Sequence, residues 1–352
     1  MIKGIGLSRS RFKWPLLLLF TAHVAVGQPR YTIEVIQPLP GADDSRAFAI
    51  NDSSVVAGDS RPNGNTWPIV WSHGVTKGLG SLSLSAGGTA RGINRAGVVV
   101  GAYSGGPTSD GSDRAVFWSD NKLTYIGSIA DDQPIVYASG INDSGTIIGY
   151  GPDSLGFSRP VICPIGQKPI PLPVPSGTFG YAYAINNFGK AAGEFRTRNG
   201  SLAASWYRGT YSILPPLPNQ TWSVASAINN QGRVAGSSYD KGTNIGHAVI
   251  WKDQSPVDLG TAGSWSSSFA LGINDSGDVV GQLGVGGETT SAFLFTQNTI
   301  YDLNTLLVGG NGWTLSLAWD INNLGQIVGW GLLDGKVRGF VLTPVELRTV
   351  RP

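Results

Sequence analysis

A short Ile-Asn unit occurs seven times along the chain, and this repeat constrains the possible folds more than any other feature. The repeated asparagines are Asn51, Asn94, Asn142, Asn186, Asn229, Asn274 and Asn322. Neighbouring copies are 43 to 48 residues apart, a period typical of the blades of a β-propeller. Because such units stack into one continuous body, the 352 residues do not require several independent domains.

Each repeat predicts four short β-strands joined by tight turns. The strand before the asparagine is the most regular, because every copy has an alanine four positions before the Asn. These alanines are Ala47, Ala90, Ala138, Ala182, Ala225, Ala270 and Ala318. The third strand has a large aromatic residue in five copies, namely Trp71, Trp118, Trp206, Trp251 and Phe295. A Leu-Gly-like pair, such as Leu79-Gly80, marks the fourth strand. Small inner and large outer residues are what wedge-shaped blades need when they converge on an axis.

The asparagines themselves are predicted to be structural. Each begins an Asn-x-x-Gly turn in six of the seven copies, with Ser54 in place of the glycine in the first. Asn can hydrogen-bond its own backbone in such a turn, and Gly accepts a positive φ without a steric penalty. Because every blade needs the same turn, the turn explains why every repeat contains this asparagine.

The two ends of the repeat array complement each other. The seventh repeat supplies three strands, the last over residues 338–342, and no convincing fourth strand follows. Residues 31–39, ahead of the first repeat, form a strand with no partner in their own repeat. We therefore predict an all-β, seven-bladed β-propeller of four-stranded blades, closed by the N-terminal strand joining the C-terminal blade, which removes two open sheet edges. An open β-solenoid is the competing architecture.

Residues 1–27 have the three parts of a secretory signal peptide. Lys3, Arg9, Arg11 and Lys13 precede a largely apolar stretch over residues 14–26, and the small residues Ala25 and Gly27 predict cleavage after Gly27. The alternative is an uncleaved anchor, for which the apolar run is short, because a membrane-spanning helix needs about 20 residues. We expect a secreted or periplasmic protein, in which residues 28–352 form one propeller domain without a membrane span.

Charge and cysteine content exclude several classes of function. The signal peptide carries four of the 25 basic residues and none of the 23 acidic ones, so the mature chain has a net charge of −2. The main argument for a nucleic-acid partner is thereby lost. The single cysteine, Cys163, allows no intramolecular disulfide and occupies the position of the third-strand aromatic residue, so we expect a buried, unreactive thiol.

The repeat resembles a known family. Residues 247–251 (His-Ala-Val-Ile-Trp) and 291–295 (Ser-Ala-Phe-Leu-Phe), together with units of the form Ile-Asn-x-x-Gly-x-Val-Val-Gly, resemble the HAF repeat family of proteins described as extracellular. The resemblance covers essentially the whole mature chain and implies export and a repetitive β-fold, but no defined activity. Only His247 occupies the histidine position of the motif. The other copies have Trp67, Arg114, Arg159, Leu202, Ser291 and Arg338 there.

Signatures of catalysis and of metal binding are weak. His73 and His247 are the mature chain's histidines, neither has a metal-type partner nearby in sequence, and no Gly-x-Ser-x-Gly or His-Glu-x-x-His motif occurs. We predict no catalytic residue, no metal site and no cofactor. Calcium is the one ion considered, with Asp110, Asp113 and residues 131–132 as possible ligands, although the rest of a calcium loop is missing.

Aromatic residues are predicted in the loops of one face. In a four-stranded blade, the loops between the second and third strands and those between blades share a face, and these loops vary most among the repeats. The candidate binding residues are Tyr181, Trp222, Trp265, Trp313 and Trp330. Such side chains stack on sugar rings or bind a protein partner, and the alternative is that they pack between blades at the rim.

Three functions remain open at this point. The first is an exported, non-catalytic binding protein, expected to be monomeric, that takes a polysaccharide or an extracellular protein on this face. The second is a carbohydrate-active lyase or hydrolase with acids in the central funnel, for which Asp131, Glu194 and Glu288 are candidates. The third is a structural protein of the cell surface or matrix. The fold itself does not choose among them.

Overall fold

The computed structural model describes residues 28–62, 65–80, 87–104, 113–130, 133–240, 242–243, 245–285 and 289–345. The described residues from 29 to 345 belong to one compact unit. The expected signal peptide, residues 1–27, lies outside the described residues. Within the described ranges, no helix has the length and apolarity that crossing a membrane requires.

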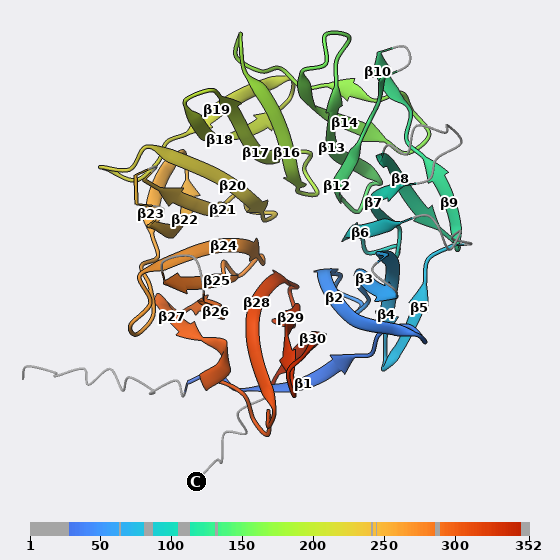
Figure 1. Cartoon of the computed structure of the whole chain (residues 1–352). Coiled ribbons are helices and arrows are strands. Elements are labelled where there is room, and N and C mark those ends of the chain that lie inside the picture. Colours follow the sequence, from blue (N-terminus) through green and yellow to red (C-terminus); the bar gives the residue numbers. More distant parts are fainter. Residues whose placement is uncertain are drawn as a thin grey trace, which may run out of the picture. The chain divides into compact units, whose positions relative to one another are not determined.

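Seven four-stranded antiparallel sheets surround a common axis (Figure 1). Blade 1 contains β2 (Ala42–Ile50), β3 (Val56–Pro62), β4 (Trp67–Ser72) and β5 (Val75–Gly78), and blade 2 contains β6 (Gly88–Ile93), β7 (Val99–Ser104), β8 (Asp113–Ser119) and β9 (Lys122–Tyr125). Blade 3 contains β12 (Tyr137–Ile141), β13 (Thr146–Pro152), β14 (Ser158–Pro164) and β15 (Ile170–Pro171), and blade 4 contains β16 (Phe179–Ile185), β17 (Ala191–Thr197), β18 (Gly200–Tyr207) and β19 (Thr210–Leu214). Blade 5 contains β20 (Trp222–Ile228), β21 (Val234–Tyr239), β22 (Gly246–Lys252) and β23 (Ser255–Asp258), and blade 6 contains β24 (Ser267–Ile273), β25 (Val279–Val285), β26 (Thr289–Thr296) and β27 (Thr299–Asp302). A small hairpin, β10 (Ser128–Ala130) with β11 (Gln133–Pro134), lies between blades 2 and 3, and one turn of 3-10 helix (Leu303–Thr305) follows β27.

Blade 7 is completed by the N-terminal strand, as predicted. Its strands are β28 (Trp313–Ile321), β29 (Ile327–Leu333) and β30 (Lys336–Pro344), and its outer strand is β1 (Tyr31–Ile36). The antiparallel register runs from Tyr31 opposite Pro344 to Ile36 opposite Gly339. In Figure 1, the blue β1 therefore lies beside the red β30. This pairing confirms the seven-bladed β-propeller and excludes an open solenoid for these residues.

Side-chain size increases from the axis outward. The repeated alanines of the innermost strands are at most 1% exposed, because neighbouring blades leave no room there for a larger group. The third strands hold Trp71, Trp118, Trp206 and Trp251, which are all buried between blades. Cys163 is buried in the same position of blade 3, and burial raises the pKa of its thiol. Its side chain therefore fills space between blades, as the sequence pattern predicted.

The fourth strands end earlier than predicted. The Leu-Gly-like pairs follow these strands instead of forming them, since β5 ends before Leu79 and β23 ends before Leu259. The Leu79 N–H still donates to the Pro68 carbonyl at 3.0 Å, but the next residue, Gly80, has a φ of +76°. A residue in that left-handed region cannot continue an extended strand. The leucine closes the ladder, and the glycine turns the chain toward the next blade.

Every innermost strand contains a β-bulge, located between the repeated alanine and the small residue that follows. The bulged residues are Phe48, Arg91, Ser139, Tyr183, Ser226, Leu271 and Trp319. A bulge redirects a side chain and tightens the approach of the adjacent strand. It also explains the glycine seven residues after each asparagine. A Cβ atom at Gly101, for example, would lie 1.8 Å from the Thr89 carbonyl oxygen, and the six equivalent distances are 1.9 to 2.1 Å.

The seven asparagines form a closed ring around the axis. Each side-chain Oδ1 accepts backbone N–H groups of its own turn, as Asn186 does from Phe188 at 3.1 Å and Lys190 at 2.9 Å. Each Nδ2 donates to the backbone carbonyl oxygen of the next repeat's asparagine, over 2.9 to 3.4 Å. The asparagine therefore holds its own turn and also links neighbouring blades, which the turn argument did not predict.

Candidate functional site

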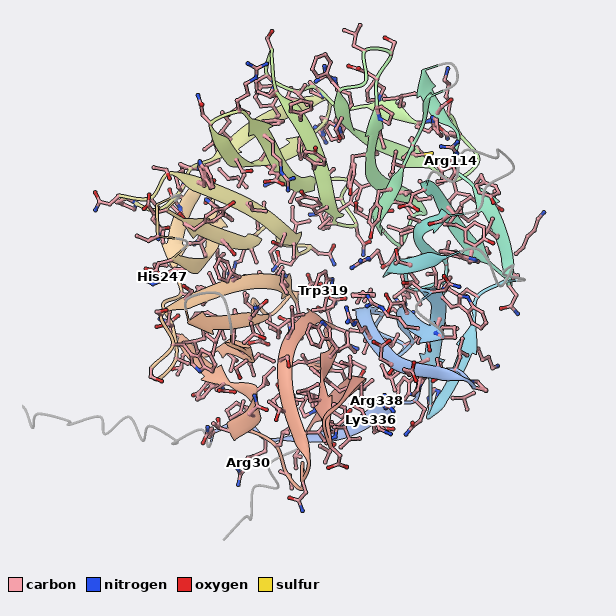
Figure 2. The ribbon with its side chains drawn as sticks, in the orientation of Figure 1. Arg30, Arg114, His247, Trp319, Lys336 and Arg338 are labelled. Carbon is pink, nitrogen blue, oxygen red and sulfur yellow. The ribbon has the colours of Figure 1, made fainter. Side chains whose placement is uncertain are left out.

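A polar and aromatic cavity lies on the propeller axis, and we call it the axial pocket. It has a volume of about 550 Å³. Its lining residues are Arg91, Tyr137, Ser139, Tyr150, Tyr183, Glu194, Arg196, Ser201, Val224, Ser226, Tyr239, Leu271 and Trp319. They come from the first and second strands of six blades, with Ser201 from a third strand, and Figure 2 shows Trp319 toward the centre of the ring. The asparagine ring lines a separate cavity at the other ends of the first strands.

A buried carboxylate of blade 4 forms part of the pocket wall. Glu194 is fully buried, and its Oε1 accepts hydrogen bonds from the Tyr183 hydroxyl at 2.5 Å and from Arg196 Nε at 2.6 Å. Burial raises the pKa of Tyr183, and the negative charge of Glu194 raises it further, so its phenol stays protonated. Burial disfavours the charged form of Arg196, but the hydrogen bond and charge of Glu194 outweigh this effect and raise its pKa. The result is a fixed ion pair with a neutral phenol as donor.

Tyrosine rings extend from this ion pair into blade 3. Tyr181 and Tyr183 are stacked at 6.4 Å between ring centroids, Tyr150 meets Tyr181 edge-on at 5.0 Å, and Tyr137 stacks on Tyr150 at 5.5 Å. The Arg196 guanidinium lies 4.7 Å from the centre of the Tyr181 ring. Burial raises the pKa of Tyr150 to about 12, so its hydroxyl is neutral at physiological pH. This row offers flat apolar faces together with hydroxyl groups.

Arg91 lies on the blade 2 side of the pocket, surrounded by rings. Its guanidinium is 4.0 Å from the centre of Phe48, 5.6 Å from that of Trp319 and 5.9 Å from that of Tyr137. Its Nε is buried and has no hydrogen-bond partner among the described residues. Cation–π contacts hold the guanidinium plane in place without using its N–H groups.

Further charged groups of blade 1 act on this arginine. Asp59 is 1% exposed, and its burial raises the pKa of its carboxyl to about 6, although the positive charges of Arg61, Arg91 and Arg46 oppose the shift. The negative charge of Asp44 acts in the same direction as burial. We call these five residues the blade 1–2 charge cluster.

Several polar atoms of the axial pocket have no partner within the described residues. They are Glu194 Oε2, Ser139 Oγ and Arg91 Nε. A buried polar atom without a hydrogen bond costs about 1–3 kcal/mol. Native proteins seldom contain such groups without a water molecule, an ion or a ligand to satisfy them. Their position in one cavity marks this cavity as the candidate site.

None of the five predicted binding residues is itself a lining residue of the axial pocket, but two of them contact lining residues. Tyr181 belongs to the tyrosine row described above. Trp222 meets Tyr239, a lining residue, edge-on at 5.5 Å, and its Nε1 donates to the Asn199 carbonyl oxygen at 2.9 Å. Trp330 contacts the blade 1–2 charge cluster instead, because the Arg46 guanidinium lies 5.0 Å from its ring centre.

The other two predicted residues lie elsewhere. Trp265 packs against the hydrophobic core between blades 5 and 6, and Trp313 packs against that of blade 7, with Phe340 edge-on at 6.1 Å. Neither residue lines the axial pocket. Their location corresponds to the alternative that rim aromatics stabilise the packing of blades.

Of the candidate acids and metal ligands that the structure describes, Glu194 is the one that lines this cavity. Of the three acids proposed for an enzyme, Glu194 lines the pocket, whereas Asp131 and Glu288 lie outside the described residues. Asp110 and residues 131–132 also lie outside them, and Asp113 accepts a hydrogen bond from the Ser104 hydroxyl. Across the part of the chain that is described, no three His, Cys, Asp or Glu side chains group together as a metal site requires.

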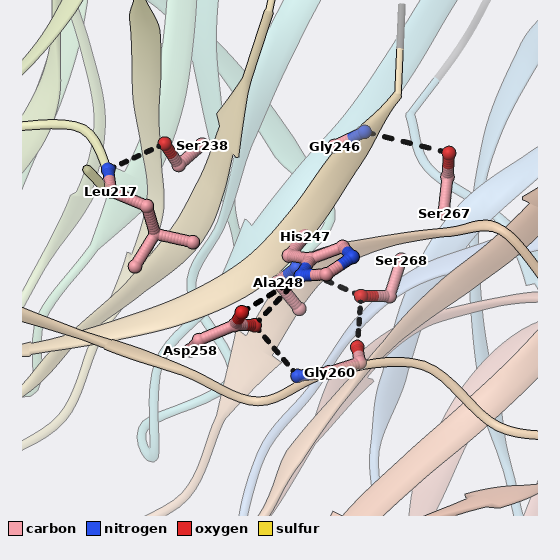
Figure 3. A network of polar contacts seen from close by, with 9 residues as sticks. All are labelled: Leu217, Ser238, Gly246, His247, Ala248, Asp258, Gly260, Ser267 and Ser268. Carbon is pink, nitrogen blue, oxygen red and sulfur yellow. Dashed lines mark hydrogen bonds and ion pairs between the residues drawn. The ribbon is translucent and has the colours of Figure 1, made fainter. Parts of the chain in front are cut away.

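His247 takes part in a local network at the periphery. Its Nδ1 lies 2.8 Å from Oδ2 of Asp258, and Oδ1 of the same carboxylate accepts the Gly260 N–H (Figure 3). The buried Ser268 hydroxyl accepts the Ala248 N–H at 2.9 Å and donates to the Gly260 carbonyl, thereby linking blade 6 to blade 5. Figure 2 shows His247 far from the central opening. These contacts hold neighbouring strands and blades together.

Sequence reasoning missed most of the residues that line the pocket. Arg91, Ser139, Tyr183, Ser226 and Trp319 are the bulged residues of the inner strands. The sequence holds a signal for them, because this position varies between an invariant alanine and a residue that is alanine or glycine in six of the seven repeats. A variable residue inside a conserved repeat unit at the axis is a candidate for ligand contact.

Comparison with known proteins identifies the fold. No protein-family model and no curated protein matches the sequence. Among solved structures, the β-propeller domain of the trilobed protease from Pyrococcus furiosus is similar, with 10% identity, a TM-score of 0.56 and coverage of 92% of this chain and 100% of that one. A streptogramin B lyase has 12% identity and a TM-score of 0.53 over 89% and 98% of the two chains. YCF48 bound to a D1 peptide has the same identity and TM-score over 91% and 97%. At these identities the likeness shows the β-propeller fold alone, and the neighbours differ in function.

Proposed function

We propose that this chain is an exported, non-catalytic binding protein that holds a glycan in the axial pocket. The observation that carries the proposal is the combination, in one cavity, of aromatic faces with polar atoms that have no partner. Sugars present apolar ring faces and hydroxyl groups that both donate and accept hydrogen bonds. Tyr137 and Trp319 supply faces for stacking, and Glu194 Oε2 and Ser139 Oγ supply sites for hydroxyl groups.

The arrangement of the acids favours binding over hydrolysis. Glycoside hydrolysis uses two carboxyl groups on either side of the scissile bond. The described residues that line the axial pocket include one carboxylate, Glu194, and its Oε1 is held by Tyr183 and Arg196. A carboxylate held by an arginine is a good acceptor for a sugar hydroxyl group.

Isothermal titration of the mature chain, residues 28–352, against defined oligosaccharides tests the proposal. Trp319→Ala and Tyr137→Ala are expected to weaken binding at least tenfold, because stacking surface in the pocket is lost. Trp313→Ala is the matched control, since it removes an aromatic ring outside the pocket. Equal affinities for all four proteins would contradict the axial pocket as the binding site. Chromatography of the glycan after incubation would reveal products if the protein were instead a lyase or hydrolase.

Export is tested separately. Expression of the full chain in a Gram-negative bacterium, with mass spectrometry of the extracytoplasmic fraction, is expected to give a mature N-terminus at Gln28. A protein retained in the cytoplasm with residues 1–27 intact would refute this part of the proposal.

A further inference from the structure

Resting on the proposed function, we further propose that the sugar in the axial pocket is acidic and that its carboxylate binds the guanidinium of Arg91. Two arginines line this pocket, and they differ in one decisive respect. Arg196 already has a carboxylate partner, because its Nε and Nη2 contact Glu194 Oε1 at 2.6 and 2.5 Å. Arg91 forms no hydrogen bond or ion pair within the described residues.

The surroundings of Arg91 prepare it for an anion. Phe48, Trp319 and Tyr137 surround the guanidinium and hold it by its π-face, which leaves its in-plane N–H groups available. A guanidinium fixed in this way binds a carboxylate through two parallel hydrogen bonds and loses little conformational entropy. An exposed arginine without such support would bind an anion weakly, because water and salt screen the charge.

The side chains around the pocket have a net charge that a single negative charge would neutralise. Arg46, Arg61 and Arg91 of the blade 1–2 charge cluster face Asp44 and Asp59, and the ion pair of Glu194 with Arg196 is neutral. These groups together leave one positive charge when both aspartates are ionised. A single carboxylate neutralises this charge, whereas a doubly charged phosphate would be repelled by the buried carboxylates.

The remaining contacts favour a uronic acid over a peptide terminus. Glu194 Oε2 and Ser139 Oγ need partners in addition to Arg91, and the hydroxyl groups of a sugar ring supply them. The tyrosine row supplies faces for the ring itself. A peptide with a C-terminal carboxylate could satisfy Arg91 and donate a backbone N–H to Glu194, but its backbone offers no saturated ring with hydroxyl groups to the tyrosine row.

The experiment compares trimers of galacturonic and of glucuronic acid with the same trimers after reduction of their carboxyl groups. Reduction removes the charge and preserves the ring and the other hydroxyl groups. For the mature protein, titration calorimetry is expected to show at least tenfold tighter binding of one or both acids. Arg91→Gln should bring each acid within about twofold of its reduced form. Arg95→Gln is the matched control, because it makes the same change of charge at the opposite end of the axis, and it should retain the preference.

Each other outcome overturns a defined part of the argument. Equal binding of acids and reduced forms contradicts the acidic sugar, and a preference retained by Arg91→Gln contradicts Arg91 as the residue that binds the carboxylate. Both outcomes leave the proposed glycan function standing. If neither the acids nor the reduced trimers bind, but a hexapeptide binds and its C-terminal amide does not, both proposals fail. Thermal denaturation shows whether Arg91→Gln is folded, and Arg91→Lys, which keeps the charge but not the two-pronged geometry, should bind the acid with intermediate affinity.

Discussion

The side-chain amide of Asn322 donates a hydrogen bond to the backbone carbonyl oxygen of Asn51 over 3.0 Å, and so joins the last repeat to the first at the axis. The ring is closed a second time beside this bond, because the Asp320 carboxylate accepts the Ile50 N–H at 3.0 Å. A third closure is at the outer edge, where β1 completes blade 7. Closure therefore does not depend on the N-terminal strand alone.

The asparagine ring predicts that aspartate is not a neutral replacement. Asn186→Asp keeps an oxygen for the Phe188 and Lys190 N–H groups but removes the donor to the Asn229 carbonyl and brings a negative charge toward that oxygen. We expect urea denaturation to show a loss of about 1–3 kcal/mol. Asn311→Asp is the control, because Asn311 is exposed and lies outside the asparagine ring, in the segment before β28. If the Asn186→Asp protein were as stable as wild type, the hydrogen bond from Asn186 to the next blade would contribute nothing to stability, and the turn would be the only role of the asparagine.

The β-bulges predict that the glycines opposite them cannot be replaced. In Gly101→Ala, the new Cβ would lie 1.8 Å from the Thr89 carbonyl oxygen, so the two strands must separate. We expect a loss of about 3 kcal/mol or more, or failure to fold. Gly127→Ala is the control, because its Cβ would lie 3.7 Å from Pro169, an ordinary contact, and it should change stability by less than about 1 kcal/mol. Similar melting temperatures for the two variants would refute the explanation.

Much of this fold could be predicted because the repeat determines it. Seven copies spaced 43 to 48 residues apart predict seven blades, and the small residues near each asparagine predict the strand closest to the axis. The partnerless strand before the first repeat predicts the closure. The ends of the fourth strands could not be placed, because Leu79 still donates a hydrogen bond within the ladder and the positive φ of Gly80 ends the strand.

The site was harder to predict, because the bulge that redirects its side chains cannot be recognised from residue types. Tyr181, Trp222 and Trp330 were predicted as binding residues because aromatic residues in variable segments favour ligand contact, yet none of them lines the axial pocket. Arg91 and Ser139 resemble ordinary surface residues in the sequence. Whether an aromatic residue faces the axis or the rim depends on the exact strand end, which explains why Trp265 and Trp313 were grouped with the others.

Asp59 predicts a pH dependence of stability. The pKa of its carboxyl is about 6 in the folded protein and 3.8 in the unfolded chain, so the folded state binds the proton more tightly. Well below pH 3.8 both states are protonated, so the side chain contributes no pH dependence there. As the pH rises from 4 to 6, the unfolded state loses its proton first, so the folded state is destabilised, by up to about 3 kcal/mol above pH 6.

The variant Asp59→Asn isolates this effect, because its amide does not titrate. The difference in unfolding free energy between Asp59→Asn and wild type is expected to shift in favour of the variant between pH 4 and pH 7. Urea denaturation at four pH values measures this shift. Asp44→Asn, which removes a neighbouring carboxylate, is the control for a general change of charge. A difference that does not vary with pH would contradict the raised pKa.

The positions of the aromatic residues predict that some substitutions weaken glycan binding, whereas others lower the stability of the fold. Tyr181→Ala removes a ring from the tyrosine row, and Trp330→Ala removes the partner of Arg46, so both should weaken glycan binding by about 1 kcal/mol or more while the melting temperature changes little. Trp265→Ala and Trp313→Ala remove rings packed against hydrophobic cores, so they should lower stability by about 3 kcal/mol and leave affinity unchanged in the folded fraction. Calorimetric titration and thermal denaturation of the four variants measure both quantities. If affinity fell with Trp265→Ala and Trp313→Ala but not with Tyr181→Ala and Trp330→Ala, the glycan would bind at the rim and the axial pocket would need another role.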